Sequence, residues 1–263
     1  MIDKKTELLA PAGDLEKLKI AVLYGADAVY IGGEEYSLRA KAKNFTEEQM
    51  KEGIEFAHSH GAKVYVTANI YAHNSDFEGM AEYFKKIEAL GADAILISDL
   101  GVFSVAREAV PNMEIHVSTQ ANNTNYMSAN MWYKLGARRV VVARELSFKE
   151  IKTIRENIPA DMDIEAFVHG AMCISYSGRC LLSNYLSGRD ANKGECVHAC
   201  RWKYYLMEET RPGEYMPVFE NERGTYIFNS KDLCMIEHMD DIINSGIDSL
   251  KIEGRMKTAL YVS

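Results

Sequence analysis

GADAVYIGG at residues 25–33 and GADAILISD at residues 91–99 are two copies of a phrase that recurs along the chain. The same pattern returns as GAKVYVTAN (61–69), GARRVVVARE (136–145) and GIDSLKIEG (246–254). Each copy opens on a glycine, which suits the left-handed position at the end of a helix. The run rich in Val and Ile that follows is too short for a helix and is typical of a strand buried on both faces.

Three further apolar runs, at residues 7–12, 114–120 and 164–170, lack the glycine and bring the predicted strands to eight. The segments between the strands have helical periodicity and cover residues 14–23, 46–58, 76–90, 99–109, 123–135 and 147–157. Regular alternation of strand and helix predicts parallel βα units. Eight such strands favour a closed TIM-type (β/α)8 barrel over an open sheet. No GxGxxG follows the first strand, so the usual dinucleotide-binding signature is missing.

Length and composition agree with one α/β domain spanning residues 1–263. The chain is 47% hydrophobic and 26% charged, which is typical of a folded domain with a sizeable core. Its net charge of -8 excludes a global basic surface of the kind that grips nucleic acid through phosphates.

The N-terminal residues 1–13 carry lysines but no long apolar run, and no later segment is long and apolar enough to span a bilayer. We therefore expect a cytoplasmic protein without membrane contact, in which thiols stay reduced. Clustered cysteines in that compartment are more often metal ligands or catalytic groups than disulfides.

Residues 170–245, between the seventh and eighth strands, form an insertion far too long for an ordinary βα connection. After the eighth strand, residues 256–263 read as the opening of a helix that stops early. A barrel needs an eighth helix to cover its last strand, so we expect the last helix to be missing from this chain.

The insertion holds every cysteine of the chain: Cys173, Cys180, Cys196, Cys200 and Cys234. Cysteines that merely fill a core would be scattered, yet none occurs in residues 1–172. Soft thiolates suit zinc or an iron–sulfur cluster, although the paired short CxxC knuckles of most zinc ribbons are missing. His169 and His198 are alternative ligands nearby. The pattern predicts a metal-type site at the barrel mouth.

Polar residues follow nearly every predicted strand, where the active sites of such barrels lie. They are Glu34, Arg39, Asn69, Asp99, Gln120, Asn122, Arg144, Glu145, His169, Glu253 and Arg255. Loop residues are commonly polar. Several arginines at one end of the barrel nevertheless favour the binding of a small anionic ligand, because the two N–H donors of a guanidinium match the two oxygens of a carboxylate. The predicted ligand-binding residues are Arg39, Asn69, Gln120, Arg144 and Arg255, and the predicted catalytic residues are Glu145, His169 and Glu253.

Residues 200–218 interleave basic and aromatic side chains. One interpretation is a stacking platform for nucleic acid. The other, which we favour, is a hairpin that turns at residues 211–213, with Tyr204, Leu206 and Val218 packed inward.

Five phrases of the sequence resemble the peptidase U32 family of collagenase-like proteins. They are residues 7–33, 165–183, 194–204, 229–234 and 249–257. The second contains the family signature, which falls at Glu165, Phe167, Gly170, Ala171, Cys173, Gly178, Cys180 and Ser183.

The resemblance implies a barrel-like catalytic domain in a family whose members usually continue well past this C-terminus. It implies either a peptidase of unassigned catalytic type or a protein that installs hydroxyl groups on a tRNA wobble uridine, on ribosomal RNA cytidine or in ubiquinone synthesis. Several such relatives draw on prephenate and carry a [4Fe–4S] cluster. The ligand pattern of the ubiquinone branch corresponds to Cys173, Cys180, Cys196 and Cys234, and Cys200 is an alternative to Cys196.

Three hypotheses follow. The first is an iron–sulfur-dependent enzyme that hydroxylates tRNA, with a dicarboxylate such as prephenate as co-substrate and RNA bound partly through a further C-terminal region. The second is a protease. The sequence has no HExxH or GxSxG motif, and a Cys173–His169 pair would leave four cysteines unexplained. The third is a protein that only scaffolds a cluster, against which the polar strand ends argue.

Overall fold

The eight predicted strands are all present. The computed structural model describes residues 5–38, 44–202, 204–217, 220–221, 224–225 and 232–263. The strands are β1 (Glu7–Pro11), β2 (Ala28–Gly32), β3 (Lys63–Ala68), β4 (Ala94–Ile97), β5 (Glu114–Val117), β6 (Arg139–Val141), β7 (Asp163–Ala171) and β13 (Ser249–Ile252). The glycines at 25, 61, 91, 136 and 246 all have positive φ, as expected where a helix ends and the chain turns into a strand.

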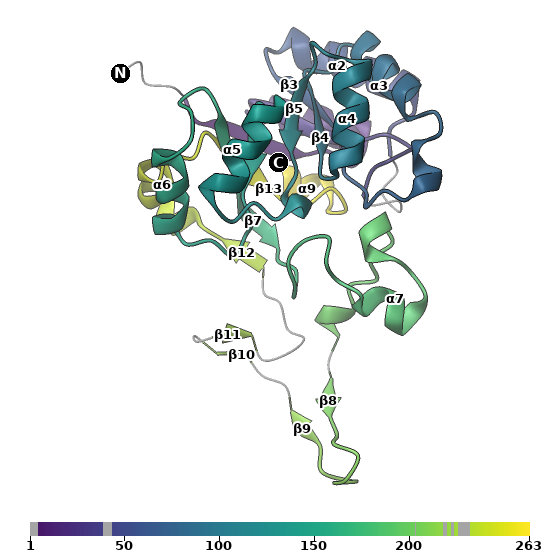
Figure 1. Ribbon diagram of the computed structural model, residues 1–263, viewed down its shortest axis with the longest axis vertical. Coiled ribbons are helices and arrows are strands. Elements are labelled where there is room, and N and C mark those ends of the chain that lie inside the picture. Colours follow the sequence, from purple (N-terminus) through teal and green to yellow (C-terminus); the bar gives the residue numbers. More distant parts are fainter. Residues whose placement is uncertain (1–4, 39–43, 203, 218–219, 222–223, 226–231) are drawn as a thin grey trace.

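These strands pair in parallel in the order β7-β13-β1-β2-β3-β4-β5-β6, and β6 also pairs with β7, so the sheet closes on itself. Helices surround the sheet in Figure 1. The predicted TIM-type barrel is confirmed. Because the strands are parallel, their carboxyl ends all open toward the same mouth.

The outer helices are α1 (Leu15–Leu23), α2 (Glu47–Ser59), α3 (Met80–Ala89), α4 (Leu100–Ala109), α5 (Tyr126–Leu135), α6 (Phe148–Glu156) and α8 (Met239–Asn244). The first six begin and end close to the predicted positions, and α8 lies in the insertion, where no helix was predicted. Capping boxes at Thr46 and Ser147 fix the starts of α2 and α6. The segment 76–90 divides into a 3₁₀ turn (Asn74–Phe77) and α3, because Gly79 between them has a left-handed φ of 76°. After β13 the short helix α9 (Ala259–Val262) opens where the eighth helix was expected. No helix among the described residues is long and apolar enough to cross a bilayer.

Apolar side chains form two cores. The larger lies between the strands and the helices, and the smaller fills the barrel interior on the β1–β4 side with residues such as Leu9, Tyr65 and Leu96. On the β5–β13 side the interior carries charged residues instead, including Arg139, Glu165 and Lys251.

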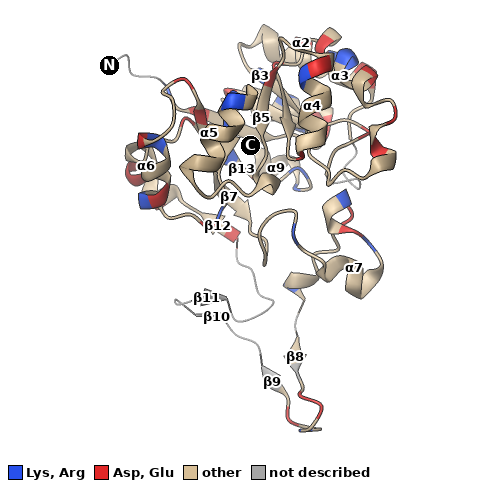
Figure 2. Cartoon of the chain, viewed as in Figure 1, with Lys and Arg blue, Asp and Glu red and all other residues tan. Residues whose placement is uncertain are grey.

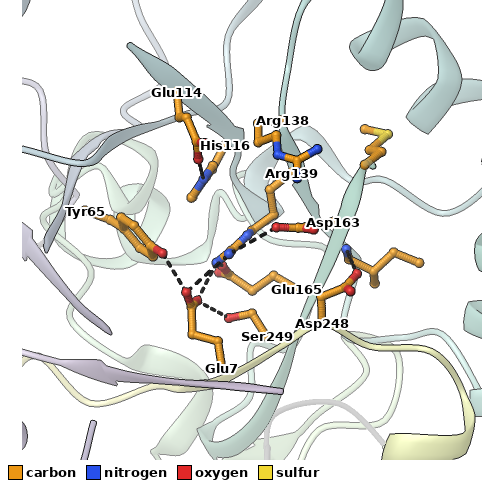
Figure 3. A network of polar contacts seen from close by, with 12 residues as sticks. Glu7, Tyr65, Glu114, His116, Arg138, Arg139, Asp163, Glu165, Asp248 and Ser249 are labelled. Carbon is orange, nitrogen blue, oxygen red and sulfur yellow. Dashed lines mark hydrogen bonds and ion pairs between the residues drawn. The ribbon is translucent and has the colours of Figure 1, made fainter. Parts of the chain in front are cut away.

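The charged half of the interior is an ionic network at the starts of the strands (Figure 3). Arg139 binds Glu7 at 2.6 Å, Glu165 at 3.1 Å and Asp163 at 3.4 Å, and Lys251 binds Glu165 at 2.7 Å. Burial raises the pKa of the Glu165 carboxyl, but attraction to Lys251 and Arg139 outweighs burial and leaves that pKa below its usual value. The carboxylates are therefore charged and paired inside the barrel.

The insertion leaves the barrel after β7 and returns along β12 (Asp232–Cys234), which pairs antiparallel with the outer end of β7. Between them lie α7 (Leu182–Ser187), a 3₁₀ turn at Ala191–Lys193 and another at Ala199–Arg201. The strands β8 (Tyr205–Leu206) and β9 (Met216–Pro217) form an antiparallel hairpin that points away from the barrel in Figure 1, and β10 (Glu220–Asn221) pairs with β11 (Gly224–Thr225). The predicted hairpin is confirmed, with Tyr204 half-buried. The side chains of Leu206 and Val218 lie outside the described residues.

Candidate functional site

The mouth of the barrel carries a polar network on the loops after β3 and β5. The Asn69 amide nitrogen donates to Ser118 Oγ at 3.2 Å and to Gln120 Oε1 at 3.3 Å, and Ser118 Oγ donates to Gln120 Oε1 at 2.6 Å. The Asn69 side-chain oxygen Oδ1 accepts the Leu38 backbone N–H at 3.3 Å. The structure thus brings together two of the predicted ligand-binding residues, Asn69 and Gln120.

Arg144, after β6, reaches into the insertion. Its Nη1 lies 3.6 Å from Cys173 Sγ and 3.3 Å from Ser177 Oγ, and its guanidinium stacks 3.9 Å from the centre of the Phe167 ring. No carboxylate among the described residues pairs with it, and its Nε has no hydrogen-bond partner there. The cation is thus held in place by an aromatic ring and left electrically uncompensated.

Arg255, after β13, was predicted to bind ligand, and in the structure it contacts other residues of the chain. It is buried, and its Nη1 donates to Ser37 Oγ at 2.9 Å and to Thr67 Oγ1 at 3.0 Å while Nη2 donates to the Leu38 carbonyl. As placed, it ties the loop after β2 to strand β3.

The three predicted catalytic residues lie in different surroundings. Glu253 Oε2 accepts the Tyr30 hydroxyl at 3.3 Å, and the Glu253 backbone N–H donates to the His169 carbonyl at 2.8 Å, so these two residues are neighbours. The His169 ring lies 5.7 Å from that of Tyr261. Glu145 is exposed. Arg39 lies outside the described residues.

Four of the five cysteines gather in the insertion near the mouth. Burial, followed by the electrostatic influence of the nearby Cys173 and Cys196 and then of Cys180, raises the pKa of the Cys200 thiol. The Cys196 sulfur accepts the His198 backbone N–H at 3.4 Å. Cys234 is placed separately, on β12 opposite His169 of β7. All five are free thiols.

Ser183, the last residue of the family signature, organises the loops that carry the cysteines. It is 2% exposed. Its Oγ donates to the Arg189 carbonyl at 2.7 Å and accepts the Val197 N–H at 3.1 Å. The insertion is tied back to the barrel loops by an ion pair of 3.0 Å between Lys193 and Asp76.

Buried polar atoms without a partner among the described residues collect at this mouth. They include Thr119 Oγ1, Asn122 Oδ1, Arg144 Nε and Ser175 Oγ. Asn122 also has a left-handed φ of 54°, which a residue other than glycine adopts at a cost. Such atoms need water or a ligand, so the mouth has unused binding capacity.

The cysteines could hold either of the two metal groups expected from the sequence, zinc or an iron–sulfur cluster. In the described part of the chain no group of three or more His, Cys, Asp or Glu side chains converges to hold a metal ion. A single zinc requires about four donors within about 2.3 Å of one point. A cluster spreads its ligands more widely, because each thiolate binds a different iron, and the donor chemistry fits it.

Sequence reasoning assigned no role to Ser177 or Arg179. Ser177 contacts Arg144, and Arg179 stacks 5.0 Å from the Tyr71 ring. Their position between Cys173 and Cys180 was the signal that could have identified them.

Comparisons with known proteins agree with this architecture. The sequence profile of peptidase family U32 matches residues 13–263. The chain is 49% identical over 263 residues to tRNA hydroxylation protein P1 of Bacillus subtilis (strain 168), covering 100% of this chain and 62% of that protein. It is 43% identical over 296 residues to tRNA hydroxylation protein P of Escherichia coli (strain K12), covering 98% of this chain and 65% of the relative. The chain therefore spans less than two thirds of these relatives. The solved structure of the U32 peptidase Mk0906 has the same fold, with a TM-score of 0.63 at 14% identity over 97% of this chain and 95% of the other.

Proposed function

The chain belongs to peptidase family U32, and from that membership we propose that it is the cluster-binding barrel of an enzyme that hydroxylates tRNA. The observation that carries the proposal is the group of thiols at the barrel mouth beside the uncompensated Arg144. Relatives named for tRNA hydroxylation are 49% and 43% identical to the chain and support the assignment. An RNA substrate and five free thiols both suit the reducing cytoplasm expected from the sequence.

The proposed cofactor is a [4Fe–4S] cluster held by Cys173, Cys180, Cys234 and either Cys196 or Cys200. When bound, such a cluster supplies one-electron transfer. The protein's own contribution is to tune it, because hydrogen bonds to ligand sulfurs and burial set the reduction potential. Two such bonds are in place, from Arg144 to Cys173 and from the His198 backbone to Cys196. Zinc is the less suitable group, because the described side chains do not converge on one point.

The proposed co-substrate is a small dicarboxylate such as prephenate. Arg144 supplies a cation without a carboxylate partner among the described residues, and the polar Asn69–Gln120 network lies at the same mouth. A carboxylate is the ligand that a guanidinium matches best. His169 and Glu253, which are neighbours, are the proposed groups for moving protons, and Glu145 stays a prediction from the sequence. The tRNA target is proposed to be the wobble uridine.

A protease would need a nucleophile activated by a base. In the structure the Cys173 thiol contacts Arg144, and the His169 ring lies against Tyr261. This arrangement favours hydroxylation over the cysteine-protease alternative. Gelatin cleavage by wild type and by Cys173→Ala provides the check, since a robust activity lost in the variant would favour the protease.

Anaerobic purification and reconstitution test the cluster. We expect about four irons and four sulfides per chain, with loss of iron in Cys173→Ser, Cys180→Ser and Cys234→Ser. Cys196→Ser and Cys200→Ser are matched variants in one loop, and only the one that removes a ligand should lose iron. A wild-type protein that holds no iron after reconstitution would overturn the proposal.

A chimera tests the activity, because the chain covers only part of its relatives. This chain replaces the aligned segment of the Bacillus subtilis protein P1, and the chimera is expressed in a strain that lacks tRNA hydroxylation proteins. Mass spectrometry of tRNA nucleosides should detect 5-hydroxyuridine with the chimera and not with its Cys173→Ser form. Restored iron binding without any hydroxylated uridine would contradict the proposed reaction.

A further inference from the structure

Four of the cavities that the described residues line differ in the chemistry of their linings. One, between the barrel and the helices α6 and α8, is lined mainly by apolar side chains. Two, near the loop after β2, contain Glu34 and Glu35 and so disfavour anions. The fourth, which we name the ring pocket, lies at the ends of β4 and β5 and encloses about 580 Å³ of space open to solvent. Its lining includes Tyr71, Ser98, Asp99, Gln120, Trp132 and Arg179.

Two aromatic rings form walls of the ring pocket. Trp132 is half-buried and packs against Phe103, with ring centres 5.4 Å apart, so its position is fixed by the core. Tyr71 is 44% exposed, and its backbone N–H donates to the Asn192 carbonyl of the insertion at 3.1 Å. Aromatic faces presented at an opening are the usual support for an unstacked nucleobase.

Polar atoms in the same lining offer both a donor and an acceptor. The Gln120 carbonyl oxygen is occupied by Ser118 and Asn69, while its amide nitrogen donates to no described residue. Asp99 uses Oδ1 to cap α4 through the Val102 N–H at 3.0 Å, which leaves its second oxygen for another donor. Asp99 and Gln120 line the same pocket, and an amide N–H together with a carboxylate oxygen offers the donor and the acceptor that the edge of a pyrimidine such as uracil requires.

Arg179 supplies the charge. Its guanidinium lies over Tyr71, and no carboxylate among the described residues pairs with it. It directly precedes Cys180, and Gly178 packs so closely on Gln120 that an added Cβ would lie 3.0 Å from Gln120 Cβ. The insertion therefore closes one side of the ring pocket with a phosphate-binding group and places a cysteine beside it.

We propose that the ring pocket binds one unstacked pyrimidine nucleotide of the RNA, its base between Tyr71 and Trp132 and its phosphate on Arg179. The inference rests on the proposed function, since it names the part of the substrate that enters the site. The projecting hairpin is a poorer platform for RNA, because Glu208, Glu209 and Glu214 make the region around its turn acidic (Figure 2). A nucleobase must leave its stack before an enzyme can react at its ring.

Tryptophan fluorescence tests the ring pocket without any chemistry. The chain has two tryptophans, and Trp202→Phe leaves Trp132 as the sole reporter. In that background we titrate the full chain with uridine 5′-monophosphate, uridine and inorganic phosphate. Uridine 5′-monophosphate should change Trp132 emission, and Arg179→Gln should weaken its binding about ten-fold, as loss of a charged phosphate contact would. Arg211→Gln, an exposed arginine of the hairpin, is the matched control and should change nothing.

The nucleoside separates the roles of the residues. Uridine lacks the phosphate, so its weaker binding should be unaffected by Arg179→Gln but reduced by Gln120→Leu.

No response of Trp132 to the nucleotide, or equal weakening of nucleotide and nucleoside by Arg179→Gln, would overturn the inference. So would a Trp132 response to prephenate but not to the nucleotide. A chimera that hydroxylates tRNA while Trp132 ignores the nucleotide would overturn the ring pocket alone. Nucleotide binding at Trp132 without hydroxylation would overturn only the proposed function.

Discussion

Arg139 and Arg144 lie at the two ends of β6, and their surroundings are opposite. Arg139 begins the strand and contacts three carboxylates, those of Glu7, Asp163 and Glu165. Arg144 follows the strand and contacts a thiol, a hydroxyl and an aromatic ring, with no carboxylate among the described residues. One end of the strand neutralises its cation, and the other leaves it available.

The difference separates a stabilising end of the barrel from a binding end. Charges buried at the strand starts must be matched, because an unpaired buried charge costs several kcal/mol. At the mouth an unpaired cation is tolerated because it lies near solvent. It can attract an anionic ligand or a thiolate. TIM-type barrels in general place function at the carboxyl ends of their strands.

The largest expected effect tests the stabilising end. Glu165→Gln removes the carboxylate shared by Arg139 and Lys251 and leaves two buried cations less compensated. We expect a loss of about 3–5 kcal/mol in the free energy of unfolding, measured by urea denaturation. Glu88→Gln, on the exposed face of α3, is the matched control and should stay within about 0.5 kcal/mol. Equal stability of the two variants would show that the ion pairs of Arg139 and Lys251 with Glu165 do not stabilise this end of the barrel.

Arg255 sharpens the comparison, because it lies at the mouth but is buried and fully engaged. Arg255→Lys loses the fork that reaches Ser37, Thr67 and the Leu38 carbonyl at once. We expect a loss of about 1–3 kcal/mol in the free energy of unfolding, with Arg211→Lys as control. A stable variant that has instead lost affinity for a dicarboxylate would show that Arg255 binds ligand, as the sequence suggested.

Acidification should weaken the stabilising end in two steps. Burial lowers the pKa of His116 from 6.5, so below that pH the unfolded chain takes up a proton that the folded chain resists. Burial raises the pKa of Glu7, but the Arg139 contacts prevail and hold it below 4.5, so its contribution is lost at still lower pH. Between pH 6.5 and one pH unit lower, we expect the free energy of unfolding to fall by about 1 kcal/mol.

His116→Asn separates the two steps. Its free energy of unfolding, followed by urea denaturation across pH, should stay flat through the upper step and fall only in the lower one. A variant that keeps the same slope as wild type in the upper step would show that another group titrates there.

The smallest expected effect on stability is at Arg144. Arg144→Gln removes the stack on Phe167 and should cost less than about 1 kcal/mol, because no carboxylate is left unpaired among the described residues. Urea denaturation together with iron content after reconstitution measures it. A loss as large as that of Glu165→Gln would mean that both ends of β6 serve stability alike.

The sequence by itself determined the eight strands, the helices between them and the position of the cysteine insertion. Those features depend on local physics: glycines that end helices, capping boxes at Thr46 and Ser147, and short apolar runs buried on both faces. Because parallel strands open toward one mouth, it also placed Asn69, Gln120 and Arg144 at the same end.

Only the tertiary structure decided what each of these side chains contacts. Arg139 contacts Glu7, which lies far from it in the sequence, because closure of the barrel brings β6 and β1 to face each other across the interior. Glu145 and Arg144 are adjacent in the turn after β6, yet one is exposed and the other reaches Cys173. Arg255 became a brace and Arg179 a pocket wall for the same reason: contacts between distant segments depend on how the strands and loops pack, which local sequence does not encode.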